Sequence, residues 1–145
     1  MESVQTANRT FTTRRSRGPS AGSYEAAAAL RIGLRRLLAR TEEITRAHHL
    51  TPERYELLLL IKTAPEGEAT VGKLAERLSI GQSAATQLAR RAENLGLIGR
   101  TVSASDARVR PLHLTEEGER RLAGAVAALE HERTAFASTL GPLVV

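Results

Sequence analysis

Residues 70–115 read TVGKLAERLSIGQSAATQLARRAENLGLIGRTVSASDARVRPLHLT. The apolar spacing predicts a short helix over 71–78, a turn over 79–81 and a second helix over 82–95. Residues 98–114 then surround a polar tip with two short runs of alternating apolar and polar side chains, which predicts a two-stranded hairpin. This order predicts a winged helix-turn-helix, a fold that places its second helix in the major groove of DNA.

The second helix of this stretch has two different faces. Apolar side chains at helical spacing are expected to face inward, namely Ala85, Leu88, Ala92 and Leu95. The outer face has polar or cationic side chains and no acid before Glu93: Gln82, Ser83, Thr86, Gln87 and Arg90. Gln and Arg can pair with base edges, and Ser and Thr can bond bases or phosphates. A solvated outer face would usually mix Glu with Lys, so we predict that this face reads the major groove.

The hairpin carries its own candidate DNA contacts. Arg108 and Arg110 follow the polar tip, where they can reach the minor groove or the DNA backbone. Asp106 lies two residues before Arg108 and is expected to bond the backbone of the turn and orient the guanidinium. Pro111 lacks an N–H group, so pairing should stop there or the strand should lie at an edge.

Helices are expected on both sides of this stretch. Ser23 can cap a helix that ends near His49, and Thr115 can cap a last helix that reaches about residue 140. The first helix has an apolar stripe that suits a core or a partner helix: Leu30, Leu34, Leu37, Leu38, Thr41, Ile44 and His48. Between them, Thr51 and Pro52 start a further helix.

Charge is distributed unevenly along the 145 residues, whose net charge is +5. Residues 1–22 hold four Arg and one Glu, giving +3, and residues 81–114 hold five Arg, one Glu and one Asp, again +3. A phosphate-binding surface and a merely soluble basic face both fit this pattern. Residues 1–22 are expected to be a disordered tail, either without a role or reaching DNA through its arginines.

Several classes of protein are excluded or disfavoured. The chain has no cysteine, so it has no disulfide, thiol sensor or cysteine-ligated zinc. No apolar run is long enough to span a membrane and the first 23 residues have no signal-peptide core, so a cytoplasmic location is expected. No nucleophile–base pair, phosphate loop or carboxylate pair has a spacing that catalysis needs, so we predict that the chain is not an enzyme and has no cofactor.

Four segments together resemble the MarR family of bacterial transcriptional regulators. They are Leu50-Thr51-Pro52, the helix over 71–78, Gly96-Leu97-Ile98, and the string Asp106-x-Arg108-x-x-x-Leu112-x-Leu114-Thr115-x-x-Gly118. The last string is the specific part, and the resemblance covers about residues 24–140. It implies a mainly α fold with a small β-hairpin wing and a single domain over 23–145. Within that domain, a DNA-binding lobe would span about 51–114, and dimerisation helices would span about 23–49 and 115–140.

The resemblance also implies a function and its partners. A homodimer would bind double-stranded DNA at an inverted-repeat operator, most simply as a repressor relieved by a small-molecule effector. Residues 82–90 would read the major groove, and Arg108 would enter the minor groove. The family's ligands commonly occupy a crevice beside the dimer helices, where His48, His49 and Tyr55 should lie. Relatives often continue with another dimer helix after Gly141-Pro142, so a smaller interface or a different exchange of the first helix is expected here.

Two alternatives stay open. Some relatives bind zinc, but His48 and His49 would point about 100° apart on a helix, so no metal site is predicted. The chain could also be a protein-interaction module, such as an anti-regulator, that kept the fold and lost operator binding. Replacing Arg108 by Ala would separate the two functions, because only a DNA-binding protein would lose DNA affinity.

Overall fold

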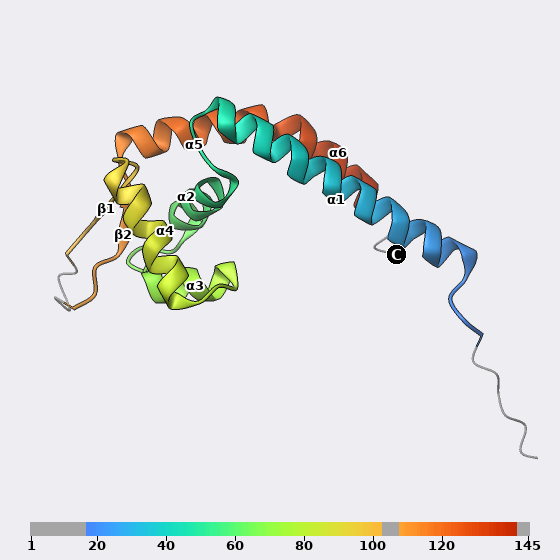
Figure 1. Ribbon diagram of the computed structural model, residues 1–145, viewed down its shortest axis with the longest axis horizontal. Helices are drawn as coiled ribbons and strands as arrows, with labels where there is room; N and C mark the ends of the chain where they lie inside the picture. The colour runs from blue at the N-terminus through green and yellow to red at the C-terminus, as the bar shows by residue number, and fades with distance from the viewer. Residues whose placement is uncertain (1–16, 103–107, 142–145) are drawn as a thin grey trace, which may run out of the picture.

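The computed structural model describes residues 17–102 and 108–141. The elements follow in the order α1 (Ala21–Ala47), α2 (Pro52–Thr63), α3 (Val71–Leu78), α4 (Gln82–Asn94), β1 (Ile98–Arg100), β2 (Leu112–Leu114), α5 (Glu116–Ala128) and α6 (Glu130–Leu140). Helices α2, α3 and α4 and the hairpin form a lobe, and α1 and α6 run side by side away from it as a two-helix arm (Figure 1). The predicted fold, mainly helical with a small antiparallel hairpin, is confirmed.

Threonine caps start three of the helices in the way that the sequence predicts. The Oγ1 atoms of Thr51, Thr70 and Thr115 accept hydrogen bonds from the backbone N–H groups of Arg54, Lys73 and Gly118. Each cap satisfies one of the N–H groups that the first turn of a helix leaves without an internal partner. The expected start of α1 at Ser23 is wrong, because Ser20 is the cap and its side chain accepts from the N–H of Ser23 at 3.2 Å.

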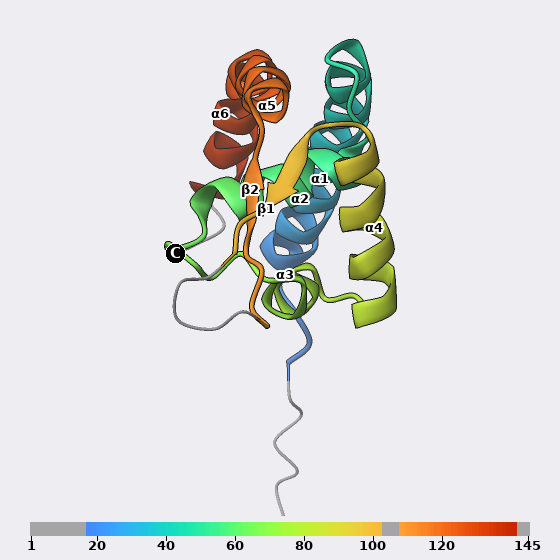
Figure 2. The same cartoon turned by 90° about the vertical axis from the view of Figure 1, so that its left-hand side faces the viewer.

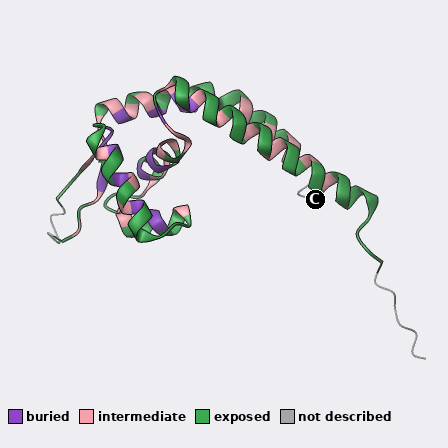
Figure 3. Ribbon diagram, viewed as in Figure 1, coloured by how far each residue is buried: buried purple, intermediate pink, exposed green. Residues whose placement is uncertain are grey.

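The core of the lobe lies between α2, α4 and the hairpin. Leu57 and Leu58 of α2 and Leu97, which leads into β1, are almost completely buried. Buried residues are concentrated in the lobe and in α5, whereas most of the arm is exposed or half-buried (Figure 3). The lobe is therefore the part of the molecule that has its own apolar core.

The hairpin is short and is held on both edges. β1 and β2 are antiparallel, with Ile98 opposite Leu114 and Arg100 opposite Leu112. The sheet ends at Pro111, as predicted. The carbonyl of Pro111 still accepts a hydrogen bond from the N–H of Thr101 at 2.9 Å. On the other side, the N–H of Leu112 donates to the carbonyl of Ala69 at 2.8 Å, which ties the loop before α3 to β2.

The prediction of a single helix from Thr115 to about residue 140 is wrong. The helix is interrupted at Leu129, which separates α5 from α6. Leu129 has φ −89° and ψ −2°, and it is buried. The guanidinium of Arg133 donates from Nη1 to the carbonyl of Val126 at 2.7 Å, which satisfies a carbonyl at the break. The break lets α6 turn away from the lobe and lie along α1 (Figure 1).

Among the described residues, no helix is both long and apolar enough to cross a membrane.

Candidate nucleic-acid interface

Helix α4 lies against the lobe through small side chains. Ala85, Ala89 and Ala92 are buried, and Leu88 is half-buried. The prediction that Leu95 faces inward is wrong: it is 46% exposed, and Ala89 occupies the inner face instead. Leu95 is the C-cap, so it lies where the helix is already turning away from its axis, and the periodic pattern no longer applies.

The opposite face of α4 is open to solvent along its length and lies at the outside of the lobe (Figure 2). The side chains predicted to read DNA that are exposed there are Gln82, Ser83, Gln87 and Arg90. Thr86 differs, because it is half-buried and its Oγ1 donates to the carbonyl of Gln82 at 2.8 Å. Its hydroxyl proton is thus already used within the helix, and only its lone pairs remain for another partner.

The acid at the end of this face is neutralised by a residue that the sequence analysis did not select. Arg100 of β1 donates from Nε to Glu93 Oε1 at 2.6 Å. The pair links the last turn of α4 to the first strand of the hairpin. Cross-element pairs of this kind have no signature in sequence spacing, so only the charge of Arg100 could have suggested it.

The base of the wing and the start of α3 enclose a cationic hollow of about 390 Å³. It is lined by Thr70, Val71, Arg100, Arg108, Val109 and Arg110. Three arginines thus line one hollow beside the start of α3, although the guanidinium of Arg100 is bonded to Glu93. Arg108 and Arg110 are exposed, as their predicted role requires. Asp106, the third predicted wing residue, lies outside the described residues.

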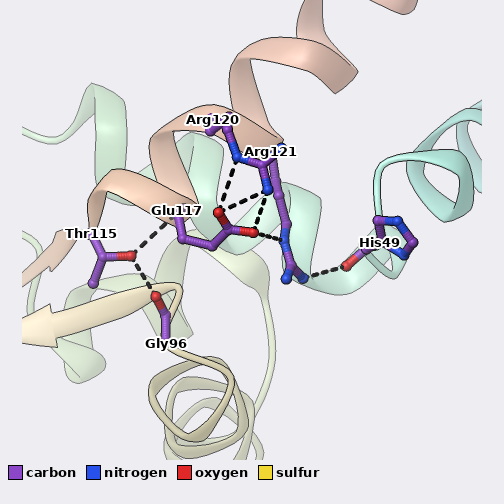
Figure 4. Close-up of polar contacts among 7 residues, drawn as sticks. His49, Gly96, Thr115, Glu117, Arg120 and Arg121 are labelled. Atoms are coloured by element: carbon purple, nitrogen blue, oxygen red, sulfur yellow. Dashed lines mark hydrogen bonds and ion pairs between the residues drawn. The ribbon is translucent and has the colours of Figure 1, made fainter.

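The start of α5 connects this surface to the arm (Figure 4). Oγ1 of Thr115 donates to the carbonyl of Gly96, at the end of α4, and the N–H of Thr115 donates to the carbonyl of Leu97 at 3.0 Å. Two residues on, the carboxylate of Glu117 accepts from Arg120 and from Nε of Arg121. These hydrogen bonds, and then the two positive charges, hold the pKa of Glu117 below its ordinary value of 4.5.

The same network reaches the corner between α1 and α2. Arg121 donates from Nη1 to the carbonyl of His49 at 3.0 Å, and His49 has the left-handed φ of 56°. The ring of His48 packs so closely against Gly124 that a Cβ there would overlap it. The two histidines therefore lie in a chain reversal after α1 ends at Ala47, and not on a helix as expected. Among the described residues, no three His, Asp or Glu side chains are arranged to hold a metal ion.

Tyr55, the third residue expected in a ligand crevice, lies on α2 and is half-buried. Burial raises the pKa of Tyr55 above its ordinary value of 10.0, and the nearby positive charge of Arg133 acts in the opposite direction. The hollows found on the described surface are lined by other residues, so a ligand site at these three residues stays a prediction.

The sequence and fold were compared with those of known proteins. Residues 48–109 match the model of the MarR family. Over 64 residues the chain is 39% identical to the HTH-type transcriptional repressor MdtR of Bacillus subtilis, a match that covers 44% of this chain and 41% of that protein. The chain therefore spans less than half the length of this curated relative.

Solved structures extend the likeness to most of the fold. A MarR family protein from Bacillus stearothermophilus is 27% identical, with a TM-score of 0.67 over 86% of this chain and 84% of that chain. The chain is therefore similar to the MarR family in sequence over residues 48–109, and its fold is similar to that of a MarR family protein over most of its length. The fold is also similar to that of the M. tuberculosis transcriptional regulator MOSR, which was solved in complex with DNA. That structure is 23% identical, with a TM-score of 0.60 over 87% of this chain and 88% of the other.

The match to the MarR family model supports the resemblance that the sequence suggested, and the structure shows what two residues of the string Asp106 to Gly118 do. Thr115 and Gly118 are the residues through which α5 sits on the end of α4 and the start of β1. The relative MdtR is named a transcriptional repressor, which agrees with the prediction that this chain is not an enzyme.

Proposed function

We propose that this chain is a DNA-binding transcription regulator that acts as a homodimer on inverted-repeat operators. The observation that carries the proposal is the outer face of α4, which presents Gln82, Ser83, Gln87 and Arg90 to solvent on a helix seated by alanines. Its one nearby acid, Glu93, is paired with Arg100. The face therefore offers hydrogen-bond donors and positive charge to base edges and phosphates, with little repulsion.

The wing extends this surface. Arg108 and Arg110 lie beside the start of α3, in a hollow that also contains Arg100. Exposed arginine side chains of this kind can form charge-assisted hydrogen bonds with phosphate groups of the DNA backbone. The similar regulator MOSR was solved in complex with DNA, and the relative MdtR is named a repressor, so repression is the proposed sign of regulation.

The homodimer is supported by the arm. α1 and α6 pack on each other, and Arg40 of α1 also pairs with Glu132 of α6 at 3.1 Å. Large apolar side chains on α1 nevertheless remain exposed in the single chain: Tyr24, Leu30, Ile32 and Leu38. Exposed apolar side chains gathered on one element suit burial against another protein. A second copy with two-fold symmetry would cover them and set two α4 helices about one DNA turn apart, roughly 34 Å.

Selection of bound sequences from random double-stranded DNA tests the proposal. We expect an inverted repeat to be enriched and its affinity to fall steeply with salt, because bound phosphates release counterions. The relief of binding by a small-molecule effector is part of the proposal and is tested by the same assay with the ligand added.

Two results of this selection would contradict the proposal. Enrichment of no sequence at moderate salt would favour the alternative, a protein-interaction module on the same fold. Enrichment of a single half-site by a monomeric chain would refute the homodimer while leaving DNA binding intact.

A further inference from the structure

A further hollow lies beside the hairpin, and its lining does not include His48, His49 or Tyr55. Its volume is about 570 Å³, and it is bounded by the end of α2, the loop before α3, the hairpin and the first turn of α5. Sites for small organic ligands usually measure about 300–1,000 Å³. The hollow is therefore large enough for a molecule with one or two rings.

Apolar side chains form about half of the walls of the hollow. Ile61, Pro65, Val102 and Leu114 line it, and Val102 is 63% exposed at its edge. Covering such an exposed apolar side chain with a ligand removes apolar surface from water, which favours binding. The apolar body of a ligand would therefore lie against these four side chains.

The polar groups of the hollow decide the charge of the ligand. Nζ of Lys62 donates to both carboxylate oxygens of Glu119 at 2.8 Å, so these two charges neutralise each other. Glu66 also lines the hollow, and no ion pair or side-chain hydrogen bond to it is found within 17–102 and 108–141. Lys62, Glu119 and Glu66 together carry a net charge of −1. An anionic ligand would be repelled, and a monocation would be attracted.

Two more groups offer hydrogen bonds. Oγ1 of Thr101 and Nδ1 of His113 lie 2.7 Å apart across the hairpin, and both residues line the hollow. The ring of His113 is packed over Gly99 so closely that a Cβ there would touch it, which holds the ring in place. A fixed pair of this kind gives the ligand a defined polar contact on the wing side.

We propose that this hollow binds a small organic monocation with an apolar, ring-containing body, held by Glu66 and the apolar walls. The ligand would contact Thr101 and Val102, the residues that follow β1 toward the wing tip. It would also lie against the Lys62–Glu119 bridge between α2 and α5. Occupancy would therefore couple to the position of the wing. The claim that the ligand is an effector rests on the proposed regulatory function. The claim that the hollow binds the ligand does not depend on that function.

The test compares three probes that share one apolar body: phenylbutylamine, phenylbutanol and phenylbutyrate. Each is titrated into the full-length protein without DNA, and backbone amide shifts are followed by NMR. We expect the amine to bind more tightly than the alcohol and the butyrate least, with the largest shifts at Thr101, Val102, His113 and Leu114. Equal affinity for amine and butyrate would overturn the proposal, as would amine-induced shifts centred on His48 and Tyr55.

Two variants localise the site. Glu66→Gln should weaken amine binding by up to about fivefold, the usual range for one exposed charge pair, and leave phenylbutanol binding unchanged. Glu68→Gln is the matched control, because Glu68 lies on the same loop, pairs with Lys73 and does not line the hollow. Ala64→Phe should fill the hollow and abolish binding of all three probes. An equal loss in the Glu66 and Glu68 variants would contradict the role of Glu66.

The titration also separates this inference from the proposed function. If the chain binds the amine but no DNA sequence, the proposed ligand site is supported and the proposed regulatory function is refuted. A chain that binds an inverted repeat but shows no saturable amine shifts would retain the role and lose the site.

Discussion

Gly118 of α5 lies directly against the backbone carbonyl of Leu97, so that any Cβ at position 118 would overlap the carbonyl oxygen. The same carbonyl accepts the N–H of Thr115 at 3.0 Å, and the Thr115 side chain caps α5 through the N–H of Gly118 at 3.1 Å. The first turn of α5 is therefore seated on the segment that joins α4 to β1. This contact fixes the position of the start of α5 relative to the end of α4 and the start of β1.

Replacing Gly118 by Ala should lower the free energy of unfolding by about 3 kcal/mol, because an added methyl group in a closely packed site forces the backbone to shift. The measurement is urea unfolding followed by circular dichroism. The matched control is Gly72→Ala on α3, where an added Cβ would meet nothing within 4 Å. That change should stabilise the protein by about 0.5 kcal/mol, since Ala is the better helix former. Equal effects at the two positions would contradict the close contact at Leu97.

The Glu117 network predicts a defined acid sensitivity. Because the folded pKa of Glu117 is lower than its ordinary value of 4.5, the carboxylate contributes stability above pH 4.5, and this contribution is lost as pH falls through the folded pKa. Glu117→Gln should therefore destabilise the protein at neutral pH and flatten the decline in stability below pH 4.5. Thermal unfolding over a pH series checks this. Glu116→Gln, one residue earlier and exposed, is the control and should leave the decline as steep as in the unchanged protein.

The outer face of α4 and the wing should affect DNA binding in different ways. Arg90→Ala should cost about 1–3 kcal/mol and relax sequence preference at one operator position, since Arg is expected to contact a base edge. Arg110→Ala should weaken binding to all sequences and reduce the magnitude of the salt slope by about one, as expected for a phosphate contact. Fluorescence anisotropy against operator and scrambled DNA at several salt concentrations measures both. Arg46→Ala, on α1 and paired with Glu42, is the control. Identical behaviour of the Arg90 and Arg110 variants would contradict this division of roles.

The dimer predicted from the arm can be tested without DNA. Leu38 is 59% exposed in the single chain, so Leu38→Glu should not disturb the core of one subunit. In a dimer it would bury a charge and shift the protein toward monomer, which analytical ultracentrifugation measures. Ile80→Glu is the control, because Ile80 is also exposed but lies in the turn between α3 and α4. A dimer that persists in the Leu38 variant with unchanged affinity would place the interface elsewhere.

The local signals in the sequence were sufficient for the lobe. Thr51 and Thr115 act as helix caps as predicted, Thr70 caps α3 in the same way, and Gly96, with φ of 73°, follows α4 as a C′ glycine. These features depend on neighbouring residues, so they can be read along the chain.

Features that depend on distant residues could not be predicted in this way. The break at Leu129 is stabilised by Arg133 and lies where α6 turns to pack on α1, and the alternation of residues within 115–140 contains no sign of it. The Arg100–Glu93 pair and the approach of His48 to Gly124 likewise join segments that meet only in the fold. Their consequence for the candidate site is that Arg100, which no motif marked, belongs to the cationic surface.

In α4, the side chains that pack on the lobe are different from those that face solvent, so stability and surface recognition depend on different residues. Ala85, Ala89 and Ala92 provide the contacts with the lobe, and none of the exposed outer side chains takes part in that packing. Substitutions on the outer face can therefore accumulate without a loss of stability that selection would remove. On the proposed function, duplicated copies of this chain could diverge toward new operators while keeping one scaffold, and an engineer could retarget the protein by the same route.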